Sequence, residues 1–168
     1  GASDAKVRIA AGIELLATSD EARAAFALAN RAMAQQAKRR LGIEDPQWRL
    51  FQLAFVLLCL PSVTDDHHDE RDWVELIFFP TGGGKTEAYL GLTAFTLAIR
   101  RLQGDVDGHS GEGGVGVLMR YTLRLLTAQQ FQRAATLICA CEVRRRELVA
   151  AGDHRWGATP FRIGMWVG

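Results

Sequence analysis

The chain has 168 residues, of which 48% are hydrophobic and 23% are charged, and its formal net charge at pH 7 is +1. This length suffices for one domain with a buried core, and the composition is that of a globular protein. The near-neutral total excludes binding to nucleic acid by bulk charge alone, so any basic surface must be local.

The sequence also argues against a membrane protein or a secreted one. The longest apolar run, residues 53–60, is far too short to span a bilayer, and no charged-then-apolar signal segment opens the chain. Its three cysteines lack the paired spacing of a disulfide or zinc site, which fits a reducing compartment. We therefore expect a cytoplasmic location and no membrane partner.

Residues 3–41 carry the periodicity of two helices. The sequence from Thr18 to Glu21 has the T-x-x-E spacing of a capping box, which predicts the start of the second helix. Apolar residues then recur every three or four positions, and Gly42 is suited to end the helix. We expect residues 1–45 to form an N-terminal helical extension that precedes a second domain, residues 46–168.

A mostly apolar helix is predicted for residues 47–60, after Pro46 and before Pro61. Aspartate and histidine side chains then gather in the loop 64–70. A metal site is one interpretation of this loop, but consecutive loop residues seldom converge on one ion. A solvated loop is the interpretation that we favour.

Residues 73–89, WVELIFFPTGGGKTEAY, have the pattern of a buried strand, a glycine-rich turn and a helix. Glycine has no Cβ to keep phosphate oxygens from the backbone amides, and the helix N-terminus adds positive partial charge. In such a P-loop, Lys85 reaches the β- and γ-phosphates of ATP and the Thr86 hydroxyl binds Mg²⁺. Lys85 and Thr86 are thus the candidate catalytic residues. The backbone amides predicted to bind phosphate belong to Thr81, Gly82, Gly83 and Gly84.

The remaining sequence alternates between strand-like and helix-like segments. A helix over residues 85–102 precedes a glycine-rich loop, and a second helix is predicted over residues 125–150. Apolar runs at 115–121 and 161–167 have the pattern of buried strands. With the strand before the P-loop, this order predicts an α/β fold in which helices flank a parallel sheet.

The P-loop departs from the pattern G-x-x-x-x-G-K-[ST] because Phe79 occupies the position of the first glycine. The form x-P-T-G-x-G-K-T resembles superfamily 2 helicases and translocases, which bind ATP between two RecA-like lobes and move on nucleic acid. The resemblance implies that residues 46–168 are the front part of a RecA-like lobe. It also implies that the chain ends before the Walker B carboxylate.

Two further stretches resemble motifs of that superfamily. Arg49-x-Phe51-Gln52 resembles its adenine-reading element, and the Gln52 amide offers the donor and acceptor that adenine requires. A glutamine held in a helix is the alternative. Residues 120–129 resemble the motif that grips the nucleic-acid backbone, where Arg120, Thr122 and Arg124 could contact phosphates. A helix capped by Thr122, with the arginines in solvent, is the alternative there.

Residues 73–95, 113–142 and 161–168 together resemble the helicase component of DISARM, a bacterial anti-phage defence system. The resemblance implies an ATP- and Mg²⁺-dependent helicase or translocase that acts on nucleic acid, with DNA favoured over RNA as the substrate. It also implies a second core component of the DISARM system as a partner. We expect these 168 residues alone to be inactive, because half of a phosphoryl-transfer site does not turn over. Another P-loop NTPase, such as a kinase, and a scaffold that binds ATP without hydrolysing it remain alternatives.

Overall fold

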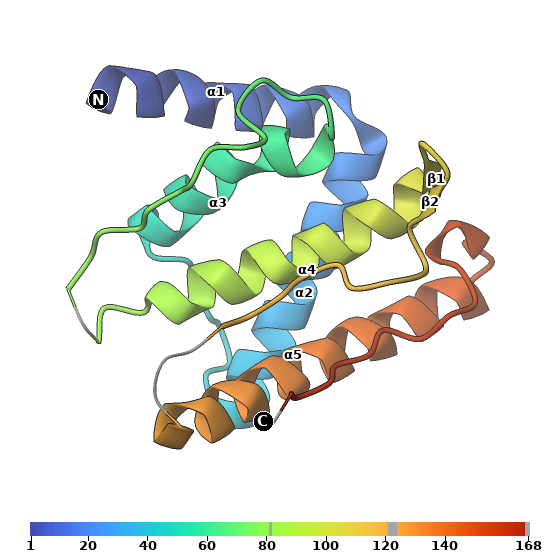
Figure 1. The fold of residues 1–168 in the computed structure, drawn as a ribbon. Helices are drawn as coiled ribbons and strands as arrows, with labels where there is room; N and C mark the ends of the chain where they lie inside the picture. Colours follow the sequence, from blue (N-terminus) through green and yellow to red (C-terminus); the bar gives the residue numbers. More distant parts are fainter. Residues whose placement is uncertain (81, 121–123, 167–168) are drawn as a thin grey trace.

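A computed structural model describes residues 1–80, 82–120 and 124–166, without the side chains of residues 124–127. The described part is mainly helical (Figure 1). Its elements are α1 (Ala2–Thr18), α2 (Asp20–Leu41), α3 (Leu50–Thr64), α4 (Lys85–Gln103), β1 (Asp105–Val106), β2 (His109–Ser110), α5 (Arg124–Ala150) and the 3-10 helix η1 (His154–Trp156).

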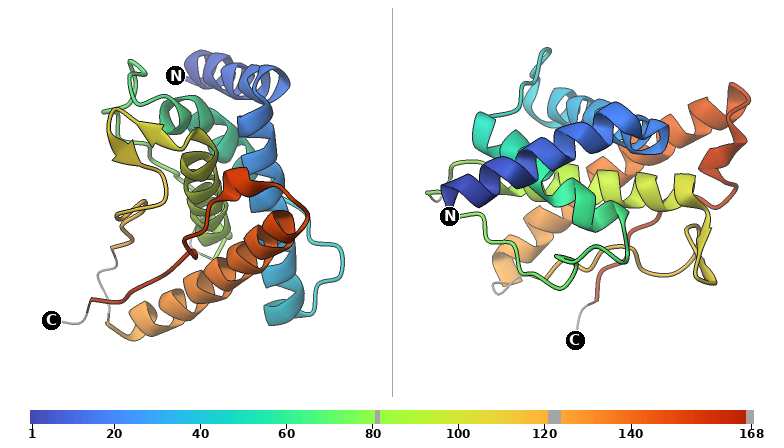
Figure 2. Two further views of the ribbon diagram at one scale, coloured as in Figure 1. Left: turned by 90° about the vertical axis from the view of Figure 1, so that its right-hand side faces the viewer. Right: turned by 90° about the horizontal axis from the view of Figure 1, so that it is seen from above.

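The helices pack around α4, which crosses the middle of the molecule. α2 packs against both α4 and α5, and α3 packs between α1 and α4 (Figures 1 and 2). The helices approach closely because small side chains line the contacts, and the alanines buried in α2 and α4 are Ala22, Ala25, Ala29, Ala32, Ala88, Ala94 and Ala98. Larger buried side chains, among them Leu60, Phe95 and Trp156, fill the core. One core therefore joins helices from both predicted domains, and the boundary at residue 45 stays a prediction.

Local signals set most helix boundaries. α2 begins after Ser19, whose hydroxyl accepts the Ala22 N–H at 3.1 Å, so the cap lies one residue beyond the predicted Thr18. Gly42 ends α2 in the left-handed conformation, as predicted. The helices predicted at 85–102 and 125–150 are confirmed as α4 and α5, within one residue at each end.

The third helix lies further along the chain than predicted. α3 begins at Leu50 rather than residue 47, because the Gln52 side chain accepts the Arg49 N–H at 2.9 Å and caps the first turn there. It also continues past Pro61 to Thr64. Proline removes one N–H from the helix, but the Pro61 carbonyl still accepts the N–H of Asp65 at 3.0 Å. The last turn therefore forms despite the proline.

The predicted parallel sheet, and with it the RecA-like lobe, is contradicted by the structure. Among the described residues, the strand pairing is the two-stranded antiparallel hairpin of β1 and β2. Its turn residues Asp107 and Gly108 have φ angles of 51° and 76°, the left-handed values that a tight hairpin needs. The segments 73–79, 115–120 and 161–166, predicted as strands, are irregular.

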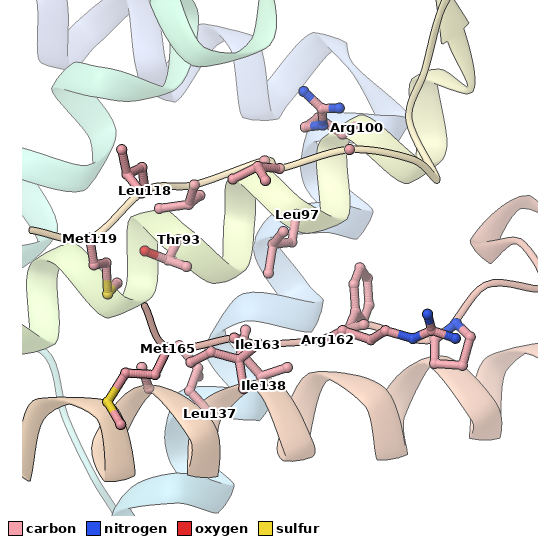
Figure 3. A pocket seen from close by; sticks show the side chains of 18 of the residues that line it. Thr93, Leu97, Arg100, Leu118, Met119, Leu137, Ile138, Arg162, Ile163 and Met165 are labelled. Atoms are coloured by element: carbon pink, nitrogen blue, oxygen red, sulfur yellow. The ribbon is translucent and has the colours of Figure 1, made fainter. Parts of the chain in front are cut away.

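The three irregular segments do not pair with one another in the described part of the chain. In the first of them, Val74 and Phe78 are each 94% exposed. The other two run along α4 and α5, with a cavity of about 1180 Å³ bordered by residues of both segments (Figure 3). An apolar run becomes a strand only where a neighbour accepts and donates its backbone hydrogen bonds, and hydrophobic periodicity does not report on that neighbour.

The sequence predicts no membrane-spanning segment, and at residues 64–70 it predicts a solvated loop rather than a metal site. None of the described helices has the length and apolar character that a bilayer crossing requires. No group of three His, Cys, Asp or Glu side chains is placed to hold a metal ion in the described ranges. In the loop after α3, the exposed His67 ring lies 3.1 Å from a carboxylate oxygen of Asp107.

Candidate nucleotide-binding site

The glycine-rich loop turns sharply into the first residue of α4. Gly82 and Gly84 have φ angles of 82° and 91°, a left-handed conformation that other residues adopt at a cost. Gly83 is required for a different reason, since a Cβ there would lie 2.4 Å from the Phe79 ring. Each described glycine of the loop is therefore needed for its shape. Thr81 lies outside the described residues.

The side chain of Lys85, the first residue of α4, folds back onto the start of the glycine-rich loop. Its ammonium group donates to the backbone carbonyls of Phe79 and Pro80, the latter at 3.2 Å. The Gly83 N–H also donates to the Pro80 carbonyl, at 3.1 Å. The lysine thus lies at the mouth of the loop, beside the helix N-terminus, where the helix dipole favours an anion.

Arg49 and Gln52 are held against the same loop, although they precede it by more than thirty residues. Arg49 donates from Nη1 to the Gly83 carbonyl at 2.8 Å, and Gln52 donates from Nε2 to the Gly84 carbonyl at 2.8 Å. Gln52 is only 5% exposed. Both residues therefore position the loop backbone. The oxygen and the nitrogen of the Gln52 amide both bond to protein backbone in this structure. Contact of Gln52 with adenine therefore stays a prediction.

Aromatic stacking supports the loop from the side of α3. The rings of Phe51 and Phe79 stack with centroids 3.8 Å apart and planes inclined by 9°. Such a pair contributes about 0.5–1.5 kcal/mol beyond the area that it buries. Phe79, which replaces the first glycine of the usual P-loop pattern, thus anchors the start of the loop to α3.

A cavity of about 500 Å³ opens between the loop and two other helices. Its volume falls within the range of small-molecule sites. The loop side includes Gly82, Gly84, Lys85 and Thr86, the residues that the sequence predicts for phosphates and Mg²⁺. The opposite side includes Arg40 and Leu41 at the end of α2, together with Gln130 and Arg133 of α5.

An ion pair bridges this cavity. Glu87, in the first turn of α4, pairs with the Nη2 group of Arg133 on α5. A carboxylate near a helix N-terminus is favourable because the dipole is positive there. The pair links the phosphate side of the cavity to α5, and both side chains are partly buried.

Three charged residues of the cavity, Glu87, Arg40 and Arg133, were not predicted as site residues from the sequence. Glu87 follows Thr86 directly, so its position could have been inferred from the loop. Arg40 lies in the last turn of α2, where a basic residue is commonly exposed to solvent. Arg133 carried no signal, because its approach to Glu87 joins residues 46 positions apart.

Arg120, the described member of the predicted nucleic-acid contacts, does not line this cavity. Arg120 is exposed and borders the larger cavity between the irregular segments. Thr122 lies outside the described residues, and Arg124 begins α5 with its side chain outside them. Gln130 lines both cavities and therefore lies between the two regions.

Comparison with known proteins identifies a relative. The chain is 43% identical, over 178 aligned positions, to the DISARM protein DrmA of Bacillus paralicheniformis. The chain is similar to one segment of that DISARM protein. The alignment covers 96% of this chain but 16% of that relative, so the similarity describes one segment of a longer protein. No protein-family profile matches the chain.

Proposed function

We propose that the chain binds ATP with Mg²⁺ at the glycine-rich loop. One observation carries this proposal: the left-handed glycines lead into the N-terminus of α4 beside a cavity that Lys85 and Thr86 line. Backbone amides, a helix N-terminus and an ammonium group converge there, and each favours a polyphosphate. The Thr86 hydroxyl supplies the oxygen ligand that Mg²⁺ prefers.

The protein's own residues have distinct tasks in this proposal. Lys85 leaves the carbonyls of Phe79 and Pro80 to neutralise phosphate charge, while Arg49 and Gln52 keep the loop backbone in place. Thr86 would hold Mg²⁺, which would supply positive charge to neutralise the phosphates. Gln52 is the candidate for recognition of adenine, provided that its amide exchanges partners on binding.

Titration with Mg²⁺-ATP tests the proposal directly. Lys85→Ala should weaken binding at least about tenfold, because a hydrogen bond to a charged group is worth roughly 1.5–3 kcal/mol. Thr86→Ala should weaken binding more when Mg²⁺ is present than when it is chelated. Lys6→Ala, at an exposed position of α1, is the control. If the Lys85→Ala protein binds ATP as tightly as the unchanged chain, the proposed site is wrong.

We further propose that the chain is the nucleotide-binding part of an ATP-dependent DNA helicase or translocase in anti-phage defence. The relationship to the DISARM protein DrmA supports the defence role, and the x-P-T-G-x-G-K-T loop supports the motor. Such a motor would act on phage DNA in the cytoplasm, together with a second core component of the DISARM system. Arg120, Thr122 and Arg124 are the proposed contacts to the DNA backbone.

The motor proposal is tested in the full-length protein that contains this segment. Lys85→Ala should abolish both DNA-stimulated ATP hydrolysis and protection against phage, whereas Lys6→Ala should retain both. Arg120→Ala should reduce stimulation by DNA while ATP binding is kept. ATP binding without any hydrolysis would instead identify a scaffold, and transfer of phosphate to a small molecule would identify a kinase.

A further inference from the structure

The nucleotide cavity has a second basic side that the P-loop pattern does not include. Among the described residues, its lining includes three basic ones from three helices: Lys85 of α4, Arg40 of α2 and Arg133 of α5. One carboxylate, Glu87, also lines it. Positive side chains therefore outnumber negative ones around a cavity that is large enough for a small ligand.

Arg133 retains donor capacity beyond its ion pair. A guanidinium group has five N–H donors, and the pair with Glu87 uses the Nη2 group. The contact from Nη1 to Gln130 is long, at 3.5 Å, and the buried Nε makes no hydrogen bond within the described part of the chain. Because Nε has almost no accessible surface, the donor capacity that an anion in the cavity could use lies on the Nη1 and Nη2 groups.

The backbone of Arg133 is fixed by a contact between α5 and α2. The Gln36 side chain of α2, itself buried, donates to the Arg133 carbonyl at 2.8 Å. This bond holds α5 against α2 beside the cavity that Arg133 lines. The Arg133 side chain is 19% exposed, so it is partly desolvated before any ligand arrives. Desolvation strengthens its attraction for phosphate.

We propose that Arg133 is a phosphate-binding residue of the nucleotide site, with Arg40 as a weaker second contact. The inference rests on the proposed ATP binding. Glu87 holds the guanidinium beside the loop, and nucleotide phosphates would share or displace that carboxylate. Arginine suits this task because its planar fork binds two oxygens of one phosphate group. Nucleotide binding would thus draw α5 toward α4.

The rival explanation is that the Glu87–Arg133 pair only fastens α5 to α4. The two explanations predict different effects on nucleotide binding when Arg133 and Glu87 are substituted separately. If the pair is only structural, removing either partner breaks the same contact and affects binding in the same direction. If Arg133 binds phosphate, removing the arginine weakens binding, whereas neutralising Glu87 removes a competing negative charge and strengthens it.

The experiment compares Arg133→Ala with Glu87→Gln in titrations with ATP, ADP and AMP in the presence of Mg²⁺. Arg133→Ala should weaken ATP binding about tenfold or more, and AMP binding by a smaller factor, because AMP carries less charge. Glu87→Gln should raise the affinity for ATP. Arg40→Ala should weaken ATP binding by a smaller factor than Arg133→Ala. Arg39→Ala, at the neighbouring exposed position of α2, is the control.

The outcomes separate this inference from the proposal on which it rests. If Lys85→Ala leaves ATP binding intact, the nucleotide site itself is wrong. If Lys85→Ala weakens binding but Arg133→Ala does not, only the role of Arg133 is wrong. Equal weakening by Arg133→Ala and Glu87→Gln would also overturn it, in favour of a structural pair. Far-ultraviolet circular dichroism of each variant checks the fold, and Glu87→Gln remains decisive if Arg133→Ala does not fold.

Discussion

Glu142 gives the sharpest prediction about stability, because its carboxylate holds the segment after η1 against α5. It accepts two hydrogen bonds from Arg145, at 2.8 and 2.9 Å, and one from Arg146 at 2.7 Å. It also accepts the backbone N–H of Phe161 at 3.0 Å. The side chain is only 11% exposed. Glu142→Gln keeps the shape of the residue and removes its charge.

The size of the effect follows from the pKa of Glu142, which the hydrogen bonds from Arg145 lower from 4.5 to about 2. Each pH unit between the folded and unfolded values corresponds to about 1.4 kcal/mol, so the ionised carboxylate stabilises the fold by about 3 kcal/mol. Because the folded pKa is the lower one, this contribution is complete above about pH 4.5. It is lost as the pH falls toward 2.

Urea unfolding followed by circular dichroism measures this contribution. At pH 7, Glu142→Gln should lower the free energy of unfolding by about 3 kcal/mol, and the difference from the unchanged chain should shrink toward zero near pH 2. Glu147→Gln is the matched control on the same helix, because Glu147 is 56% exposed and its pair with Arg144 should contribute less than about 1 kcal/mol. A loss below about 1 kcal/mol at pH 7, or one that does not change with pH, would refute the reasoning.

Three further predictions concern close packing and burial. Gly12→Ala should destabilise the fold by about 1–3 kcal/mol in urea unfolding, although alanine favours helices, because its Cβ would lie 2.0 Å from the Leu57 carbonyl oxygen. Gly83→Ala should weaken Mg²⁺-ATP binding about tenfold in the same titrations, because the added Cβ displaces Phe79 and the loop; unchanged affinity would show that the loop adapts. Thiol labelling should modify the exposed Cys139 first, while Cys59 and Cys141, whose pKa values burial raises to about 12, should react only after unfolding. Equal labelling rates in the folded chain would contradict that burial.

The structure changes the interpretation of two predicted site residues without removing them from the site. Arg49 and Gln52 were predicted as nucleotide contacts, and the structure places them against the loop that precedes α4. Their side chains hold the carbonyls of Gly83 and Gly84. Residues of a motif that is associated with nucleotide binding can therefore also hold the loop that binds the phosphates. The ATP titrations above address which of these tasks predominates.

The local features of this protein could be read from the sequence alone. The periodicity of apolar residues predicted the helices, and Gly42 marked the end of α2. The glycines, Lys85 and Thr86 predicted a loop that leads into α4, and the structure has it at that position. Each of these features depends on residues within a few positions of one another, so the sequence contains the information that determines them.

Features that depend on distant segments were decided by the tertiary structure. The runs at 73–79, 115–120 and 161–166 have the composition of strands, yet in the described structure they do not pair, because a strand needs a neighbour as well as a pattern. The approach of Arg133 to Glu87 likewise depends on how α5 packs against α2 and α4. Periodicity reports which face of a segment is apolar, whereas packing decides which segment meets it.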